Sequence, residues 1–284
     1  MKKNKTNTSS IPKIIIFTAK FLEKLSPYLA AKFAKKLFIT PIKHKIPKRE
    51  FHMEHNSIQN KLFIPKINKE INIFEYGKSD KKILLVHGWS GRGTQLVKIA
   101  DKLLEMDYST ISFDAPAHGK SKGKTTIMTE FIECILELEK KYGKFYSIIG
   151  HSLGGMATLN AIKRGLKVEN AIIISSGDSV LDIVNNFIQK LKLNPTIALK
   201  LQKFFEKESE ESMENYSSYV AAKHVSIPVL VIHDKDDDDV PYEASINISR
   251  HLSNSKLFLT ENLGHRKILG DKCVIQEIEN FISN

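Results

Sequence analysis

The chain has 284 residues, 42% of them hydrophobic, so it is long enough to bury a full core in one or two domains. Its net charge of +11 is concentrated in residues 1–50, which contain 13 Lys and Arg against two Glu, while the remaining residues are balanced in charge. This distribution argues against a nucleic-acid-binding fold, because such a fold carries its basic stripe on the folded domain.

Residues 1–50 are expected to form a basic, amphipathic, helical arm. The polar residues 1–10 predict disorder, and two short helices are expected over residues 11–25 and 26–39, the second starting at Ser26-Pro27. On a helical wheel, one half of the second helix gathers its apolar residues and the opposite arc its lysines. The apolar half comprises Leu29, Ala30, Phe33, Ala34, Leu37 and Phe38. In the first helix, the lysines at positions 13, 20 and 24 form a narrow strip.

The arm has two interpretations that the sequence leaves open. Residues 11–39 fit a basic amphipathic element lying on an anionic membrane surface, as a peripheral contact. Alternatively, the apolar face packs on the protein's own body or covers the substrate entrance. A signal peptide is disfavoured because Lys13, Lys20 and Glu23 interrupt the apolar run. A spanning helix is disfavoured because the longest such run, Ile14–Phe17, is far shorter than about 20 residues.

Residues 51–284 are expected to form one α/β domain. Short apolar runs predict eight strands, and most of these runs are apolar on both faces, as in buried parallel strands. The runs are KLFIPKI, INIFEYG, KILLVHG, STISFDAP, FYSIIGHS, ENAIIISS, PVLVIHD and KLFLTEN. Helices are expected over residues 94–106, 125–142, 153–165, 242–252 and 271–283. This alternation predicts a doubly wound, mostly parallel sheet.

One interval breaks the alternation of strands and helices. About fifty residues, 177–226, lie between two strands, and their pattern is helical and rich in Glu and Lys. The interval is too long for a single crossover connection. We therefore expect a small helical insertion that acts as a lid.

The stretch IIGHSLGGM places a serine where a strand gives way to a helix. Gly150 and Gly154 lie two residues on either side of Ser152. A nucleophile on such a tight turn needs strained backbone angles, and side chains at the two flanking positions would clash. The hydroxyl then projects at the carboxyl edge of the sheet, beside the free amides of the first helical turn.

At this point the chain resembles the α/β-hydrolase superfamily over residues 70–284. GHSLGG is similar to the nucleophile elbow of that family, and LLVHGWSG to its first apolar strand and oxyanion loop. DAPAHGKS resembles its Asp-x-Pro-Gly-His-Gly turn, with Ala117 in place of a glycine. The resemblance implies an oxyanion hole formed by the backbone amides of Trp89 and Leu153. Arg92, beside that loop, is interpreted as a solvated surface charge rather than a contact for the substrate.

The resemblance also implies that an acid and a histidine follow Ser152 in the chain. The acid that stands three residues before Val-Pro is Asp237. The run Asp236–Asp239 leaves a slip of one residue open, and Asp178 is an alternative position that some relatives use. The other aspartates of this region are interpreted as a solvated acidic loop.

Of the ten histidines, His265 follows the last predicted strand on a glycine-marked loop, as the catalytic base of this family does. His233 precedes the proposed acid and is set aside. His87 and His118 are interpreted as structural residues, the first supporting the oxyanion loop and the second its own turn.

The expected function is hydrolysis of a carboxylic ester, a thioester or a lysophospholipid-type acyl substrate through a Ser152–His265–Asp237 triad and an acyl-enzyme. No metal or cofactor is expected, and the expected partner is a small-molecule acyl ester. Two alternatives stay open: an acyltransferase or C–C hydrolase using the same nucleophile, and a non-catalytic relative that binds membranes.

The sequence also suggests where the protein is found. Cys134 and Cys273 have no metal-like spacing, so we interpret them as free thiols in a reducing compartment. We expect a cytoplasmic protein, with peripheral contact on the inner face of the membrane as the alternative that the arm suggests. No nucleic-acid partner is expected.

Overall fold

The structure is a computed structural model that describes residues 11–283, so the disorder expected for residues 1–10 lies outside the described residues. The chain divides into two compact units. The arm–insertion unit comprises the chain through Ile39 together with Ser179–Asn215. The sheet unit comprises Thr40–Asp178 and Tyr216–Asn284. This division falls earlier in the chain than the boundary at residue 50 expected from composition.

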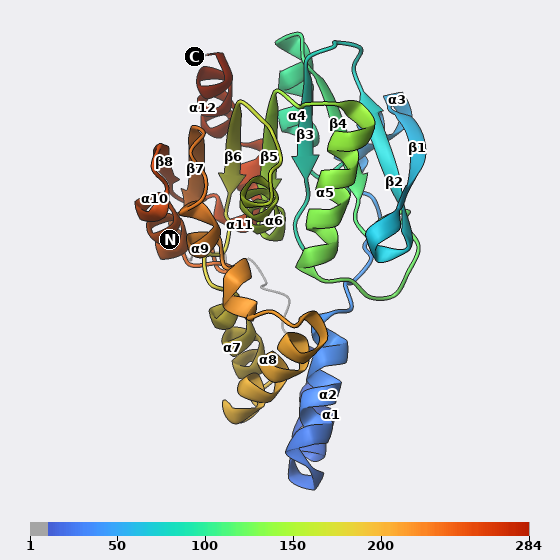
Figure 1. Cartoon of the computed structure of the whole chain (residues 1–284), viewed down its shortest axis with the longest axis vertical. Helices are drawn as coiled ribbons and strands as arrows, with labels where there is room; N and C mark the ends of the chain where they lie inside the picture. The colour runs from blue at the N-terminus through green and yellow to red at the C-terminus, as the bar shows by residue number, and fades with distance from the viewer. Residues whose placement is uncertain (1–10, 284) are drawn as a thin grey trace. The chain divides into compact units, whose positions relative to one another are not determined.

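The described elements follow the predicted order of strands and helices (Figure 1). The strands are β1 (Ile58–Ile64), β2 (Lys69–Tyr76), β3 (Lys82–Val86), β4 (Ser109–Asp114), β5 (Ser147–His151), β6 (Asn170–Ile174), β7 (Val229–Asp234) and β8 (Ser255–Thr260). The longer helices are α1 (Lys13–Leu25), α2 (Pro27–Phe38), α4 (Val97–Glu105), α5 (Met128–Tyr142), α6 (Leu153–Lys163), α7 (Val180–Lys190), α8 (Thr196–Ser209), α10 (Glu243–His251) and α12 (Lys272–Ser283). The shorter helices are α3 (Phe51–Asn56), α9 (Ser218–Ala222) and α11 (Gly264–Lys267), and four 3₁₀ turns complete the set: η1 (Lys48–Glu50), η2 (Pro65–Ile67), η3 (Met213–Tyr216) and η4 (Ile268–Gly270).

The sheet unit is built on one sheet whose strand order is β1-β2-β4-β3-β5-β6-β7-β8. β1 and β2 pair antiparallel, as do β2 and β4, and all pairs from β4–β3 to β7–β8 are parallel. The predicted doubly wound, mostly parallel sheet is therefore confirmed. The carboxyl ends of parallel strands meet at one edge of a sheet, where such folds carry their ligand sites.

Each face of the sheet buries its own hydrophobic core, because alternate residues of a strand point to opposite faces. On β3, Leu84 and Val86 belong to the core shared with α5 and α6, which Figure 1 shows in front of the sheet. Ile83 and Leu85 belong to the other core, with α4 and α12. Burial on both faces explains why these strands are continuous apolar runs.

The arm–insertion unit packs helices from both ends of its sequence against each other. α1 packs on α2, α2 on α8, and α7 on α8. The ring of Phe38 at the end of α2 lies 5.2 Å from that of Phe187 and 5.7 Å from that of Phe205. Part of the apolar half predicted for the second arm helix is therefore used inside this unit. In residues 11–283, no helix has the length and apolar character needed to cross a bilayer.

Candidate active site

Ser152 lies on a sharp turn between β5 and α6. Its backbone angles, φ 54° and ψ −120°, fall in a region that residues other than glycine rarely adopt. Strain of this kind costs on the order of 1–3 kcal/mol and is typical of functional sites. The amide of Ser152 donates a hydrogen bond of 2.8 Å to the carbonyl of Ile174 on β6, which fixes the turn at the carboxyl edge of the sheet.

The glycines around Ser152 are required by close backbone approach. A Cβ atom on Gly150 would overlap the carbonyl of Gly154, and one on Gly154 would overlap the carbonyl of Val86. A Cβ atom on Gly88 would lie 2.9 Å from the Cβ of Ser152. The predicted reason for glycines at positions 150 and 154 is confirmed, and Gly88 is a third position with the same requirement.

The loop after β8 brings His265 to the loop after β7. His265 Nδ1 lies 2.7 Å from Oδ2 of Asp237. Because a carboxylate accepts, Nδ1 carries the proton and the other ring nitrogen, Nε2, is left as an acceptor. The side chain of Asp237 is fully buried, whereas that of His265 is 12% exposed. This pair can therefore receive a proton at Nε2 and stabilise the resulting imidazolium.

The carboxylate of Asp237 is held by several donors. Its Oδ1 accepts from the amides of Asp239 and Val240, each at 2.9 Å. Its Oδ2 faces both His265 Nδ1 and, at 3.3 Å, His233 Nε2. Burial by itself would raise the pKa of Asp237, but the hydrogen bonds from His233 and His265 outweigh it and hold the pKa far below its ordinary value. Asp237 is therefore a carboxylate that stays ionised.

The other acids considered from the sequence make different contacts. Asp178 accepts a hydrogen bond of 2.8 Å from the side chain of Asn247 on α10. Asp236 accepts from the amide of Asn262 at 2.9 Å. Asp238 and Asp239 are exposed. Among these aspartates, Asp237 is the one that the structure brings to the imidazole of His265.

His151, the residue before Ser152, connects the turn to His265. Its Nε2 donates a hydrogen bond of 2.9 Å to the carbonyl of His265, and the two rings lie 4.8 Å apart. Burial lowers the pKa of His151 to about 3, so this ring stays neutral near pH 7. The contact places His265 beside the residue that precedes Ser152.

The turn after β3 is held by two buried histidines. His87 Nδ1 donates to the carbonyl of Gly88 at 2.7 Å, and its Nε2 accepts from the amide of Ala115 at 3.1 Å. His118 Nε2 accepts from the amide of Ser90 at 3.0 Å, and its Nδ1 donates to the carbonyl of Pro116 at 3.1 Å. His87 supports the predicted oxyanion loop, as expected, and His118 supports that loop as well as its own turn.

Trp89 and Leu153 lie on the two segments next to Ser152: the loop after β3, whose Gly88 approaches Ser152, and the start of α6. Leu153 is the first residue of α6, so its amide has no acceptor within the helix. Trp89 directly follows Gly88, and its ring meets the ring of His118 edge-on at 5.4 Å. The two amides predicted as oxyanion donors therefore follow β3 and β5, which are neighbouring strands in the sheet.

The DAPAHG turn is organised around the buried carboxylate of Asp114. Its oxygens accept from the amides of Gly93 and Lys120, each at 2.7 Å. Burial raises the pKa of Asp114 to about 6 despite these hydrogen bonds. Ala117, which stands where the resembled motif has glycine, has φ 64°, and this explains why glycine suits that position.

The interpretation of Arg92 as a solvated surface charge is wrong. Arg92 is 9% exposed, and its Nη1 lies 3.0 Å from Oε2 of Glu50. The same oxygen accepts from the hydroxyl of Thr94 at 2.8 Å. Glu50, assigned to the arm from composition, is fully buried in the sheet unit at the end of η1. Arg92 is thus a buried structural cation that anchors the loop after β3.

Two buried residues beside Asp237 were not predicted from the sequence. His233 is fully buried, with Nδ1 2.6 Å from the hydroxyl of Ser245. Asp234, also fully buried, accepts from the amide of Gly264 at 2.8 Å and from the hydroxyl of Thr260 at 2.7 Å. Asp234 therefore fastens the loop that carries His265. The available signal was its place at the end of a run that is apolar on both faces, where a charge needs a specific partner.

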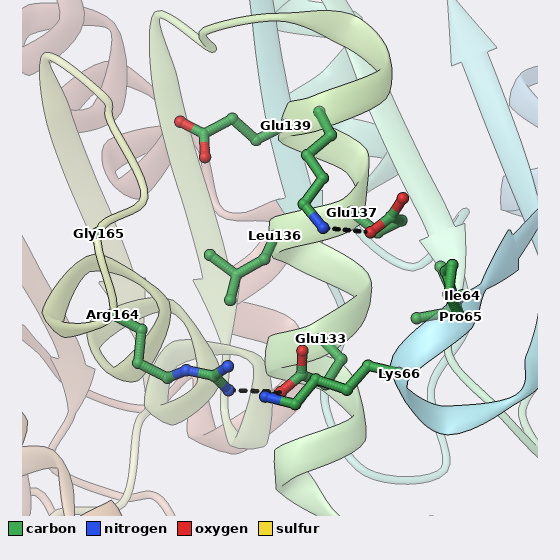
Figure 2. Close-up of a pocket in the computed structure, with 10 residues that line it drawn as sticks. Ile64, Pro65, Lys66, Glu133, Leu136, Glu137, Glu139, Arg164 and Gly165 are labelled. Atoms are coloured by element: carbon green, nitrogen blue, oxygen red, sulfur yellow. Dashed lines mark hydrogen bonds and ion pairs between the residues drawn. The ribbon is translucent and has the colours of Figure 1, made fainter.

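A groove of about 700 Å³ lies on the sheet unit between α5, the end of α6 and the turn after β1 (Figure 2). Five of its six charged lining residues pair with each other, and the sixth, Glu139, accepts a hydrogen bond of 2.8 Å from the amide of Lys167. Glu133 meets Arg164 at 2.6 Å and Lys66 at 3.1 Å, and Lys140 meets Glu137 at 2.8 Å. α6 starts at the Ser152 turn, and the residues that follow its other end, Arg164 and Gly165, line the groove. None of the predicted site residues lines it.

Within residues 11–283, no three His, Cys, Asp or Glu side chains gather in a way that would hold a metal ion. The candidate site consists of the Ser152 turn, the His265–Asp237 pair and the loop after β3. This arrangement is suited to acyl transfer through a hydroxyl nucleophile.

Comparisons with known proteins agree with this architecture. Residues 81–215 match the family model of the alpha/beta hydrolase fold, and residues 209–284 match that of TAP-like proteins. No curated protein matches the chain in sequence.

Solved structures with a similar fold include an esterase from Exiguobacterium antarcticum, with a TM-score of 0.62 and 18% identity over 80% of this chain and 100% of that chain. A monoacylglycerol lipase from Paleococcus ferrophilus has a TM-score of 0.60 and 18% identity over 75% of this chain and 98% of that chain. A membrane phospholipase A has a TM-score of 0.63 and 14% identity over 95% of this chain and 96% of that chain. At these identities the likeness is one of fold. The two family matches, which together span residues 81–284, and the mostly parallel sheet show that the chain belongs to the α/β-hydrolase superfamily.

Proposed function

We propose that the protein is a serine hydrolase of carboxylic esters or of related acyl substrates such as thioesters and lysophospholipids. Ser152 is the nucleophile, His265 the general base and Asp237 the acid that orients it. The observation that carries the proposal is the 2.7 Å contact between His265 Nδ1 and Asp237, next to the strained turn of Ser152.

In the first step, His265 Nε2 takes the proton from Ser152 Oγ as this oxygen attacks the carbonyl carbon of the substrate. The buried carboxylate of Asp237 keeps the proton on Nδ1 and stabilises the imidazolium. The tetrahedral intermediate collapses, and His265 gives the proton to the leaving alcohol or thiol. Water, activated by the same imidazole, then releases the acid from the acyl-enzyme. The proposal requires Ser152 Oγ and His265 Nε2 to come within hydrogen-bonding distance in the substrate complex.

The oxyanion of the tetrahedral intermediate accepts hydrogen bonds from the amides of Leu153 and Trp89. The first amide belongs to the amino-terminal turn of α6, whose dipole also favours negative charge. The second lies on a loop that His87, His118 and Arg92 hold in place. Loss of one such donor costs about 10²–10³-fold in turnover in comparable sites.

The choice of an acyl substrate is supported by the solved structures of similar fold, which include an esterase, a monoacylglycerol lipase and a membrane phospholipase A. We extend the proposal to the helical insertion over residues 177–226, which acts as a lid. The arm makes peripheral membrane contact through residues 11–39. The protein acts in the cytoplasm or on the inner face of the membrane.

The proposal is tested with a panel of p-nitrophenyl esters of graded acyl-chain length. Replacing Ser152 with alanine is expected to lower kcat by at least about 10⁴-fold, because the step that forms the acyl-enzyme is lost. Ser283→Ala, at an exposed serine at the end of α12 in the sheet unit, is the matched control and should keep wild-type activity. Substantial turnover by Ser152→Ala would reject Ser152 as the nucleophile. Acyl transfer to an added alcohol in preference to water would favour a transferase.

A further inference from the structure

The first arm helix, α1, has two apolar faces, of which one packs inside the arm–insertion unit. Ala19 on this inner face is fully buried, and Glu23 accepts a hydrogen bond of 2.6 Å from the amide of Asn194 in the insertion. The second arm helix is anchored by Ala30 and Ala34, which are also fully buried. The inner face of α1 therefore needs no further partner.

The outer face of α1 leaves four large apolar side chains in solvent. Ile14, Phe17, Phe21 and Leu25 are 69%, 68%, 54% and 63% exposed. Their spacing of three, four and four residues places them in one stripe along the helix. Single exposed apolar residues are ordinary on a protein surface, but a contiguous stripe on one helix marks an interaction site.

A strip of lysines runs beside this stripe. Lys13, Lys20 and Lys24 are exposed and lie within about 40° of one another on the helical wheel, next to the apolar stripe. In the sequence, Lys2, Lys3 and Lys5 precede the helix and add to its positive charge. A helix with an apolar face and an adjoining row of lysines has the composition of an interfacial helix.

The charge of the strip selects among possible partners. In an antiparallel pair of α1 helices, apolar contact between the two stripes would bring two rows of lysines to one interface, where like charges repel. Anionic lipid headgroups instead attract the lysines, while the acyl region receives the apolar side chains.

We propose that the outer face of α1, formed by Ile14, Phe17, Phe21 and Leu25, docks on an anionic lipid bilayer with α1 in the plane of the interface. Lys13, Lys20 and Lys24 contact the headgroups. This inference rests on the peripheral contact proposed above and names its face and its lipid class. It does not require the triad, because none of these residues belongs to the site.

The test is co-sedimentation with vesicles of phosphatidylcholine, with and without phosphatidylglycerol, using the Ser152→Ala protein so that turnover plays no part. Binding is expected only with phosphatidylglycerol and should weaken in high salt. Phe17→Ser/Phe21→Ser should weaken it at least about tenfold, because two apolar side chains are withdrawn from the interface. Phe51→Ser/Phe63→Ser, at exposed phenylalanines of the sheet unit, is the matched control and should bind normally.

The electrostatic part has its own pair of variants. Replacing Lys13, Lys20 and Lys24 with glutamine should remove the preference for anionic vesicles. The same change at the exposed lysines 78, 122 and 124 should leave it intact. Equal binding by the α1 variants and their controls would overturn the proposal. The proposal would also be overturned if the protein binds no vesicles and instead forms a dimer that the Phe17→Ser/Phe21→Ser substitutions dissociate.

A second measurement tests the same face if Phe17→Ser/Phe21→Ser does not fold. Phe21→Trp in a Trp89→Phe background keeps the stripe apolar and leaves one tryptophan in the chain. Its emission should shift to the blue with phosphatidylglycerol vesicles and be quenched by brominated lipid. Unchanged emission would contradict docking through this face.

Discussion

The imidazole of His265 is positioned by contacts on two sides. Asp237 accepts from its Nδ1, and His151 donates to its main-chain carbonyl. Asp234 adds a third restraint through the amide of the neighbouring Gly264. A general base must be held close to its productive position, because a misplacement of 1 Å costs about 100-fold in rate.

Substitution of Asp234 tests whether this residue positions His265. Asp234→Ala should lower kcat by at least about tenfold with little change in KM, because the loop that carries His265 loses its anchor while the substrate contacts remain. Asp234→Asn keeps an oxygen acceptor for the Gly264 amide and should restore much of the activity.

The measurement is steady-state kinetics, with thermal unfolding as the control for stability. The rate at which a phosphonate labels Ser152 should fall in parallel with kcat. Wild-type kcat in Asp234→Ala, or equal losses in the alanine and asparagine variants, would contradict a positioning role.

At the scale of elements, the loop after β3 depends on residues far away in the sequence. Glu50 at the end of η1 pairs with Arg92 and Thr94, and Asp114 at the end of β4 holds the amide of Gly93. These contacts connect the predicted oxyanion loop to two other segments. Its shape is therefore fixed before a substrate arrives, as electrostatic catalysis requires.

The buried pair of Glu50 and Arg92 gives a prediction for this element. Arg92→Ala should lower the free energy of unfolding by about 3–5 kcal/mol, because it leaves a buried carboxylate without its cation. Arg49, whose side chain is 64% exposed, contacts the same glutamate at 3.4 Å and serves as the matched control. Arg49→Ala should cost less than about 1 kcal/mol. Urea unfolding followed by circular dichroism measures both, and equal effects would contradict the buried pair.

At the scale of the whole molecule, buried titratable groups make the stability of the sheet unit depend on pH. Burial lowers the pKa of His118 to about 4 and that of His151 to about 3, and it holds the pKa of His87 well below its ordinary value. Below pH 6.5, the unfolded chain binds protons at these histidines that the folded chain does not bind. Stability is therefore lost as the pH falls. Asp114, with its pKa raised to about 6, acts in the opposite direction and offsets part of the loss.

The expected result is a free energy of unfolding that is lower at pH 5.5 than at pH 7. One pH unit below 6.5 costs about 1.4 kcal/mol for each of these histidines. His118→Gln removes one of the three groups, so the variant should lose about 1 kcal/mol less than the wild type over this range. Urea unfolding at the two pH values checks this. Constant or rising stability towards pH 5.5 would contradict the assignment of these rings as neutral.

The elements of the sheet unit could largely be predicted from the sequence, because burial on both faces of a parallel sheet leaves apolar runs of recognisable length. The eight strands and their intervening helices are confirmed. Two side chains were misjudged because burial depends on partners that local sequence does not reveal. Buried Arg92 pairs with Glu50, which lies 42 residues away in the sequence. Buried Asp234 accepts a hydrogen bond from Gly264, in the loop after β8.

The candidate site shows the same limit. The order of Ser152, Asp237 and His265 could be inferred from motifs, and the contact between the last two is present in the structure. The hydrogen bonds that His233, Asp239 and Val240 donate to Asp237 could not be inferred from the sequence, because they depend on the conformation of one short loop. Likewise, the sequence left open which face of the arm is exposed, since that depends on packing against α8.

The most direct test of the proposed nucleophile is intact-protein mass spectrometry after incubation with a fluorophosphonate, followed by peptide mapping. We expect one phosphonyl adduct per chain, located on Ser152 and absent from Ser152→Ala. The adduct should form much more slowly in His265→Ala and Asp237→Ala. An adduct on another residue, or a folded wild-type protein that stays unlabelled, would contradict this expectation.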